Sequence, residues 1–304
     1  MRVFNVGSLN VDYVYDVEHF VRPGETIASV SRSVFPGGKG LNQSIALARA
    51  GAEVWHVGTV GREAVWLKSM MRDSGVRVEL VEERADSANG HAVIQRDLMG
   101  SNCIILYGGT NQMLNEQQID EALSTADPGD WLLLQNETSG VGHAIIEAKE
   151  HGLRVALNPS PANELLATYP LDLVDLFILN EIEAKTILDE RDETNQELVE
   201  SMQRMFPESS IVLTVGESGS LFSNKSDGMR SQRAYRTNVV DTTAAGDTFT
   251  GYFIDGVMKG KNIDSVLERA SMAAAISVSR KGAAPSIPYA REVDESLLKS
   301  SESA

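Results

Sequence analysis

The stretch that decides how this chain folds is Asp241-Thr242-Thr243-Ala244-Ala245-Gly246-Asp247-Thr248-Phe249. Ala244, Ala245 and Gly246 leave the backbone uncovered at the start of a predicted helix, so their N–H groups can point at an anion. Asp247 can then take the proton of a hydroxyl that attacks a phosphoryl group, a role that contributes about 10²- to 10⁴-fold in rate. The alternative is that Asp247 caps the helix after a small-residue turn.

A second ligand-binding stretch is Phe35-Pro36-Gly37-Gly38-Lys39-Gly40-Leu41-Asn42-Gln43-Ser44, which runs into a helical pattern that ends at Gly51. A glycine-lysine pair suggests a P-loop, but that motif needs G-x-x-x-x-G-K followed by Ser or Thr. Lys39 is followed by Gly40, so a P-loop is excluded. The glycines let a small ligand touch the backbone, and Lys39 and Asn42 can donate hydrogen bonds to hydroxyl oxygens.

Together these two stretches resemble the signatures of the ribokinase family, also called the PfkB family of carbohydrate kinases. Lysine after the double glycine, with Asn-Gln following, is similar to the ribokinase branch. The resemblance covers nearly the whole chain, and its other matching segments are Asn5–Asp12, Pro23–Thr26, Gly108–Asn111, Leu157–Pro161, Asn180–Ala184, Thr214–Gly219 and Arg280–Ser286. It implies an ATP-dependent sugar kinase.

Composition agrees with an enzyme of this kind. The 304 residues, 42% hydrophobic and 23% charged, suit one large α/β domain or a domain with a lid. No apolar run approaches the roughly 20 residues of a membrane span, and the start lacks the layout of a signal peptide, so we expect a cytoplasmic enzyme. A net charge of −16 disfavours nucleic acid or an anionic membrane as a partner. The single cysteine, Cys103, excludes an intrachain disulfide.

The apolar pattern predicts strands that alternate with helices, as in a doubly wound, mostly parallel α/β sheet flanked by helices. Strands are predicted at Val3–Gly7, Glu53–Gly58, Trp131–Gln135, Arg154–Asn158, Leu176–Asn180 and Ile211–Val215. Helices are predicted at Asn42–Ala50, Glu63–Ser74, Asn115–Ser124, Gly142–His151, Glu181–Leu188, Asn195–Met205, Ala245–Met258 and Ser265–Ser279. Residues from about 11–34 and 90–107 break the alternation and predict a small separate sheet. The resemblance implies that this sheet is a lid over the sugar and a homodimer contact, within a single domain of residues 1–304.

The sugar side of the predicted site combines residues from several segments. Asn10 and Asp12 follow the first strand, at the edge of the sheet where ligands bind, and two residues apart they can grip adjacent hydroxyls. Glu137 matches the family's carboxylate near the anomeric end of the sugar. The full set that the resemblance implies is Asn10, Asp12, Gly38, Lys39, Asn42, Glu137 and Asp247.

The nucleotide side rests on the N-x-x-E motif of Asn180 and Glu183. Magnesium prefers oxygen ligands and keeps several waters, so Glu183 is expected to act through water on a phosphate-bound ion. The alternative is an ordinary acid in the first turn of a helix. The residues expected to contact ATP are Asn180, Thr214, Gly216, Gly219 and Ser271.

A monovalent-cation site is expected beside the anion-binding loop, where the family folds the C-terminal segment back. One carboxylate plus several carbonyl and hydroxyl oxygens suits potassium better than magnesium, which demands tight octahedral geometry. The residues are Asp241, Thr243, Ser277, Gly282 and Ser286. The alternative is that Asp241 caps the turn and the serines are solvated.

Several residues depart from the family pattern. Glu63 stands where an aspartate is usual, and Trp66 replaces a glycine, so the local backbone or the edge of the pocket must differ. His91 and Arg96 fall in the lid where more apolar residues are usual, and His91 is interpreted as a lid-packing residue. Because of these departures, the resemblance does not identify which sugar is the substrate.

The sequence therefore predicts phosphorylation of the primary hydroxyl of a pentose, with D-ribose giving D-ribose 5-phosphate, and with ATP, Mg²⁺ and K⁺ taking part. One alternative is a family member that acts on another sugar or a nucleoside. Another is a catalytically silent sugar-binding regulator, although the intact Asp247 segment argues against it.

Overall fold

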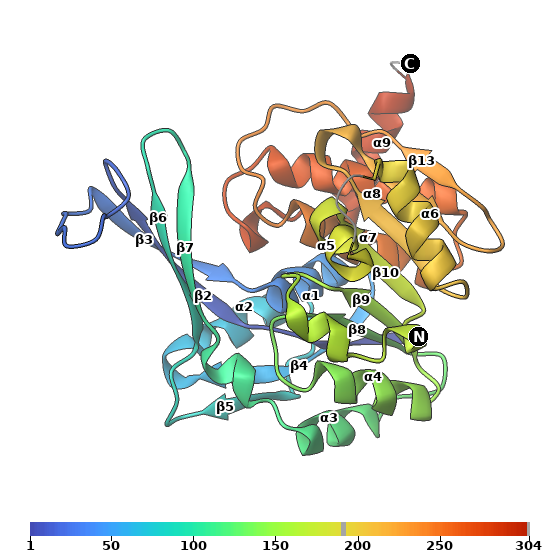
Figure 1. The fold of residues 1–304 in the computed structure, drawn as a ribbon, viewed down its shortest axis with the longest axis horizontal. Coiled ribbons are helices and arrows are strands. Elements are labelled where there is room, and N and C mark those ends of the chain that lie inside the picture. The colour runs from blue at the N-terminus through green and yellow to red at the C-terminus, as the bar shows by residue number, and fades with distance from the viewer. Residues whose placement is uncertain (190–192, 303–304) are drawn as a thin grey trace.

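The computed structural model of the protein describes residues 1–189 and 193–302, which contain two β-sheets. The main sheet has the strand order β13-β12-β11-β10-β9-β8-β1-β4-β5 (Figure 1). Its strands are β1 (Arg2–Val6), β4 (Glu53–Gly61), β5 (Val81–Arg84), β8 (Trp131–Gln135), β9 (Arg154–Asn158), β10 (Leu176–Asn180), β11 (Ser210–Thr214), β12 (Ser220–Ser223) and β13 (Arg230–Gln232). Neighbouring strands in the part β11-β10-β9-β8-β1-β4-β5 are parallel. Strand β12 pairs antiparallel with β11, and β13 pairs antiparallel with β12.

The predicted α/β fold is confirmed, and the central strands match their predicted ranges to within a few residues. Strands such as Trp131–Gln135 are buried along their whole length because both faces of the sheet are covered by helices. The antiparallel pair β12 and β13 was not predicted, because both strands are short and neither has a long apolar run.

Helices pack on both faces of the main sheet, and successive strand residues alternate between the two cores. One face carries α1 (Lys39–Ala50), α2 (Trp66–Asp73), α7 (Ala245–Met258), α8 (Ile263–Val278) and α9 (Ala290–Glu302). The other carries α3 (Glu116–Leu123), α4 (Val141–Glu150), α5 (Glu181–Leu188) and α6 (Asn195–Met205). The helix predicted at Glu63–Ser74 is a short 3₁₀ turn, Arg62–Ala64, followed by α2. Within the described chain, no helix is long and apolar enough to cross a membrane.

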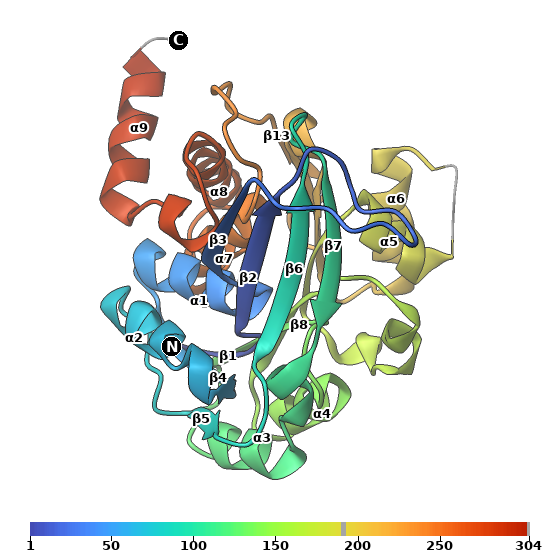
Figure 2. The ribbon, with the colours of Figure 1, turned by 90° about the vertical axis from the view of Figure 1, so that its left-hand side faces the viewer.

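The second sheet projects from the main body, and its four strands lie side by side in Figure 2. Its strands, in the order β3-β2-β6-β7, are β2 (Asn10–Asp16), β3 (Ser31–Gly37), β6 (Gly90–Arg96) and β7 (Asn102–Tyr107). The pairing Asp12–Ala92–Leu106 sets these three side chains on one face of the sheet. The predicted region 11–34 is therefore two strands joined by a long irregular connection.

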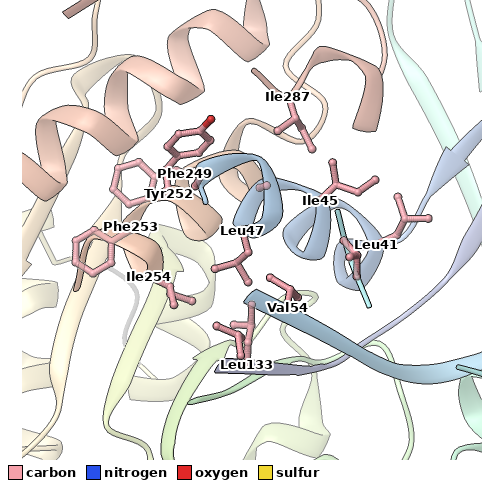
Figure 3. Close-up of a cluster of buried hydrophobic side chains, with 14 of the residues drawn as sticks. Leu41, Ile45, Leu47, Val54, Leu133, Phe249, Tyr252, Phe253, Ile254 and Ile287 are labelled. Carbon is pink, nitrogen blue, oxygen red and sulfur yellow. The ribbon is translucent and has the colours of Figure 1, made fainter. Parts of the chain in front are cut away.

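Helices α1 and α7 pack against each other, and this contact sets the position of Asp247 (Figure 3). Around it the apolar side chains of both helices form one buried cluster, including Leu47 and Phe253. A Cβ atom on Gly251 would lie 2.5 Å from the Cβ of Ala46, so glycine allows the two helices to approach closely. One turn earlier on α7 lies Asp247, which is thereby brought against the first turn of α1.

Candidate active site

A cavity of about 250 Å³ lies at the carboxyl ends of β9, β10 and β11, where open α/β sheets bind ligands. The predicted site residues among those that line it are Lys39, Asn180, Glu183, Thr214, Ala244, Ala245, Gly246 and Asp247. A larger cavity of about 450 Å³ lies at the opposite, amino ends of β8 and β10, beside Trp131 and Ile263. The smaller cavity is the candidate active site because it gathers a base, an anion-binding loop and a lysine.

Asp247 lies in the first turn of α7 and is only 7% exposed. Two side-chain amides of α1 hold its carboxylate: Asn42 Nδ2 donates to Oδ2 at 2.9 Å, and Gln43 Nε2 donates to Oδ1 at 2.8 Å. Within the described residues, no lysine or arginine nitrogen comes within 4 Å of this carboxylate. Amides orient a carboxylate without supplying a full positive charge, so Asp247 is fixed in place while its charge remains available.

The backbone before Asp247 makes the anion-binding loop. Ala244 is the N-cap of α7 and has a positive φ of 61°, which is uncommon for a residue other than glycine and turns the chain sharply into the helix. Among the described residues, no backbone acceptor contacts the N–H groups of Gly246 and Asp247. Because the helix dipole adds to these free donors, the loop can hold an anion beside the Asp247 carboxylate.

Behind Gln43 lies a buried chain of amides. Gln135 Nε2 donates to Gln43 Oε1 at 2.7 Å and to Asn5 Oδ1 at 3.0 Å. Since Gln43 Oε1 accepts from Gln135, its Nε2 must face Asp247, and it also contacts Asn158 Oδ1 at 2.9 Å. The orientation of the Gln43 amide is therefore fixed by its neighbours.

A buried histidine ends this chain of hydrogen bonds. His56 Nε2 lies 3.1 Å from the carbonyl oxygen of Gly7, so Nε2 carries the proton and Nδ1 accepts from the Ser44 hydroxyl at 2.8 Å. Ser44 in turn accepts from Asn5 Nδ2 at 2.7 Å. Burial lowers the pKa of His56 to about 4, against a smaller rise from the Gly7 contact, so the ring is neutral at physiological pH. Donation therefore runs outward from Gln135 on both sides, through Asn5 and Ser44 to His56 and through Gln43 to Asp247.

Lys39 lies among the acidic groups of the site. Burial alone would lower the pKa of its ammonium group, but the charges of Asp247, Glu137 and Glu183 raise it above its ordinary value. Lys39 is therefore charged, and it lines the cavity together with Asp247 and Glu183.

The sugar-side residues come together below the second sheet. The Asp12 carboxylate lies against the backbone of Gly37, where a Cβ atom would come within 2.3 Å of Oδ2. Burial, and next the charge of Glu137, raise the pKa of Asp12 to about 6. The hydroxyl of Ser8 and the backbone N–H of Lys39, at 3.0 Å, both donate to Glu137 Oε2.

Two of the other sugar-side predictions lie in the same place. Gly38 needs its positive φ of 95°, and a Cβ atom there would lie 2.8 Å from the carbonyl oxygen of Ser8. Asn10 Oδ1 accepts from Asn111 Nδ2 at 2.7 Å. Asn111 therefore orients Asn10, as it also accepts from the backbone N–H of Leu9.

On the nucleotide side, Asn180 and Glu183 cap α5 reciprocally. The Glu183 carboxylate accepts from the backbone and side-chain amides of Asn180, both at 2.9 Å, and the backbone N–H of Glu183 donates back at 3.0 Å. Glu183 thus has the structural role of a capping residue and also lines the cavity. Gly216, Gly219 and Ser271 do not line it.

The residues predicted to bind potassium form two groups. Asp241 accepts from the backbone and hydroxyl of Thr243, at 2.9 and 2.6 Å, and from the backbone of Gly282 at 3.0 Å. Burial would raise the pKa of Asp241, but these hydrogen bonds lower it. Ser277 and Ser286, both buried, contact each other at 2.8 Å.

Comparison with known proteins identifies the family. The sequence model described as pfkB family carbohydrate kinase matches residues 2–290. The chain belongs to the pfkB family of carbohydrate kinases. A ribokinase of Haemophilus influenzae is 34% identical over 298 residues, which cover 96% of this chain and 97% of the relative. A deoxyribokinase of Salmonella typhi is 29% identical and covers 98% of this chain and 99% of its own length.

Solved structures agree with this assignment. The structure of Arabidopsis thaliana ribokinase complexed with ribose and ATP superimposes with a TM-score of 0.83 at 27% identity, over 97% of each chain. The predicted resemblance to the ribokinase branch of the pfkB family is therefore confirmed, and the protein is a ribokinase-like carbohydrate kinase. Relatives with different substrates share the fold, so the family alone does not fix the sugar.

The departures from the pfkB pattern lie outside the cavity. Trp66 begins α2 and is 41% exposed, and it does not line the cavity. Glu63 instead accepts from the backbone N–H of Asn89 at 2.7 Å and so ties the 3₁₀ turn to the residue that precedes β6. In the second sheet His91 packs between the rings of Tyr13 and Tyr107, as expected for a packing residue.

Sequence reasoning missed the side chains that support Asp247. Gln43 and Asn158 lie in segments that match the family, but the sequence predicts no contact of either with Asp247, and Gln135 is predicted only as the end of a strand. A signal was available, because Gln135 and Asn158 are polar residues that each end a buried strand at the ligand edge of the sheet.

Proposed function

We propose that this pfkB kinase transfers the γ-phosphoryl group of ATP to the primary hydroxyl of a free pentose, with D-ribose as substrate and D-ribose 5-phosphate as product. The observation that carries the proposal is Asp247, held by two amides beside the free N–H groups at the start of α7. Its relatives named ribokinase, and the related structure complexed with ribose and ATP, support ribose.

The sugar side offers partners for several hydroxyls. Asn42 Oδ1 is buried without a hydrogen-bond partner, while the Nδ2 of the same amide holds Asp247. A sugar hydroxyl that donates to this oxygen would satisfy it and would lie next to the base. Asp12 and Glu137 add acceptors, and Lys39 adds a donor.

The charges favour a free sugar over a phosphosugar. A substrate phosphate needs cations to hold it, and on the face that carries Asp12 the second sheet offers Arg96. Its guanidinium group instead lies 2.8 Å from the Asp16 carboxylate on the neighbouring strand. Among the described residues on the sugar side, Lys39 is thus the cation that is not paired with a residue of the second sheet. The charges of several carboxylates already act on it, so it is poorly placed to hold a substrate phosphate.

In the proposed step Asp247 takes the proton of the primary hydroxyl while that oxygen attacks the γ-phosphorus. The O–P bond forms as the bond from phosphorus to the leaving oxygen of ADP breaks. The N–H groups of Gly246 and Asp247, with the dipole of α7, stabilise the charge that develops on the phosphoryl oxygens. The loop Ala244–Gly246 and the base thus act on the same group.

ATP would occupy the cavity beside Asn180 and Thr214, with Gly216, Gly219 and Ser271 proposed around its outer parts. Magnesium, when bound to the phosphates, neutralises their charge. Glu183 fits a contact through water, because its carboxylate is buried at the cavity wall and each oxygen that accepts from Asn180 has a further lone pair.

The test is ATP turnover with D-ribose, 2-deoxyribose, a nucleoside and fructose 6-phosphate. We expect kcat/KM for ribose to exceed that for 2-deoxyribose by at least about tenfold, because the missing hydroxyl leaves a buried acceptor unpaired. Preference for the deoxy sugar or nucleoside would favour the alternative substrates. Preference for fructose 6-phosphate would assign Arg96 to a substrate phosphate, and absence of turnover would indicate a sugar-binding regulator.

Potassium is proposed as an activator bound by Asp241, Thr243, Ser277, Gly282 and Ser286. This donor set is all oxygen and carries one negative charge, which suits a large monovalent ion. When bound, the ion would order the loop that precedes Ala244. The test adds potassium, caesium or sodium at constant ionic strength to an assay that contains Mg²⁺ but no sodium or potassium. The kcat should rise most with potassium, and equal rates with and without potassium would contradict the site.

The second sheet is proposed as a lid and dimer contact within a single domain of residues 1–304. Its edge strand β7 is exposed throughout, and Ile105 and Tyr107, 64% and 52% exposed, share the face opposite Asp12. Exposed apolar edge strands tend to pair with another chain. Sedimentation should show a dimer that Ile105→Lys dissociates, and a wild-type monomer would contradict the contact.

A further inference from the structure

The seam between α3 and α4 carries a cluster of metal-binding side chains that the kinase reaction does not use. Asp120 comes from α3, and His143 and Glu147 come from α4, which packs against it. One potential ligand atom from each of these three residues lies within 4.8 Å of the other two. All three are half-buried, so a small ion can reach them from solvent.

Helical spacing puts these groups on facing stripes. Glu116 and Asp120 are four residues apart on α3, while His143, Glu147 and His151 follow one another at the same spacing along α4 and its C-cap. Residues four apart lie one above the other on a helix, so two imidazoles and three carboxylates face one another across the seam.

The charge of the cluster calls for a cation. Asp120 contacts His143 Nε2 at 2.6 Å, Glu116 lies 3.9 Å from His143 Nδ1, and Glu147 contacts the Nε2 of His151 at 2.9 Å. Through the described chain, no lysine or arginine forms an ion pair with these three carboxylates. The hydrogen bond to Asp120 and the charges of the three carboxylates raise the pKa of the His143 imidazole, so the cluster attracts positive charge.

We propose that Asp120, His143 and Glu147 bind a divalent transition-metal ion of the zinc type and so link α3 to α4. One imidazole nitrogen and two carboxylate oxygens are three ligands of the kind that zinc accepts, with water as a fourth. Imidazole favours zinc, nickel or cobalt over magnesium, which prefers oxygen ligands.

Two further contacts match the way proteins support a metal-binding histidine. A metal-bound imidazole usually directs its other N–H to a carboxylate, and Glu116 lies on that side of His143. His151 likewise orients Glu147 through the latter's Oε1. The ion would replace the proton shared by His143 Nε2 and Asp120 Oδ1, whose separation must widen from 2.6 Å to about 3.3 Å for bonds of about 2.0 Å.

The test uses the full-length protein, treated with a chelator and titrated with Zn²⁺ against an indicator dye, without ATP and with Mg²⁺ in excess. We expect one Zn²⁺ per chain, an increase in the thermal midpoint, and binding at least about 100-fold weaker in His143→Gln. Glu116→Gln should weaken binding about tenfold, as expected when the partner of a metal-bound imidazole is removed. The kinase kcat with Mg²⁺ should stay unchanged in both variants.

The matched control is His19→Gln, because His19 also contacts a carboxylate, Glu25 at 2.9 Å, but belongs to no three-residue cluster among the described residues. This variant should bind Zn²⁺ like the wild type. Wild-type protein that takes up no Zn²⁺ at about 100 µM would overturn the proposal. So would unchanged binding in a folded His143→Gln variant, or a sulfur-to-cobalt absorption band with Co²⁺, which would assign the ion to Cys103.

Discussion

The two ends of α7 carry one buried aspartate each, and their surroundings differ. Asp255, only 1% exposed, has Lys259 Nζ 2.7 Å from Oδ1 and Arg269 Nη1 3.0 Å from Oδ2. Asp247, two turns earlier, is held by the amides of Asn42 and Gln43. A buried carboxylate with two cations has little charge left for chemistry, whereas one held by amides keeps its negative charge and its orientation.

The comparison shows how one helix combines structural and chemical roles. The cationic partners of Asp255 come from the next turn of α7 and from α8, and they tie these helices together. The partners of Asp247 come from α1, which the close approach at Gly251 places beside it. If this interpretation is right, a substitution at Asp247 lowers the rate and leaves the stability nearly unchanged. A substitution at Asp255 lowers the stability and leaves the rate nearly unchanged.

Asp247→Asn should have the largest effect on rate. The amide keeps the size of the carboxylate but cannot take a proton, so we expect kcat to fall by about 10²- to 10⁴-fold. Sugar affinity should change much less, and the free energy of unfolding by less than about 1 kcal/mol, because no ion pair is lost. Steady-state kinetics with a thermal melt measures both, and near-normal kcat would remove Asp247 as the base.

Asp255→Asn is the matched variant, and we expect the reverse result. Removing one partner of a buried ion pair leaves Lys259 and Arg269 without their counter-charge, which should lower the free energy of unfolding by about 3 kcal/mol. The kcat per folded molecule should stay within about twofold of wild type. Denaturant unfolding followed by kinetics on the folded fraction tests this. A large loss of kcat with normal stability would show that Asp255 supports catalysis and that its role is not structural alone.

The sequence predicted the two stretches that meet at this site and the strands between them. Near-continuous apolar runs such as Leu176–Asn180 identify buried parallel strands, and glycine followed by a helical pattern marks the ligand loops. The interpretation of Asp247 as an N-cap is wrong, since Ala244 occupies that position and Asp247 lies in the first turn. The positive φ of Ala244 causes this shift, and an alanine gives no sequence signal for it.

Contacts between distant segments could not be predicted from local patterns. The amide chain from His56 to Asp247 joins residues of β1, α1, β4 and β8, and only the packed fold sets which amides meet. The ion pair of Arg96 with Asp16 likewise depends on the register of β2 and β6. Periodicity identifies elements, but the partners of a polar side chain depend on how the elements pack.

Gln43→Leu tests whether the amides that hold Asp247 contribute to the rate. The variant removes one hydrogen bond to the Asp247 carboxylate, worth about 1.5–3 kcal/mol for a charged acceptor, so kcat should fall about 10- to 100-fold at neutral pH. Sugar affinity should change much less, because the lost hydrogen bond orients the base. Gln196→Leu is the control, because Gln196 contacts Glu200 at 2.9 Å on the exposed face of α6. A kcat within about twofold of wild type would show that Gln43 does not support the base.

Asp12 extends the comparison to a carboxylate whose neighbour is another carboxylate. Burial and Glu137 raise its pKa to about 6, so Asp12 is half protonated at about pH 6 and mostly protonated below that value. The protonated group loses acceptor capacity for sugar hydroxyls, and ribose affinity should therefore fall by up to about tenfold per pH unit below that value. Calorimetric titration of ribose without ATP, from pH 5 to pH 8, avoids the titration of the nucleotide. In Glu137→Gln the like charge is gone, so the inflection should move toward lower pH even where affinity is weaker. An inflection that stays near 6 in that variant, or a flat wild-type profile, would show that the charge of Asp12 does not control sugar binding.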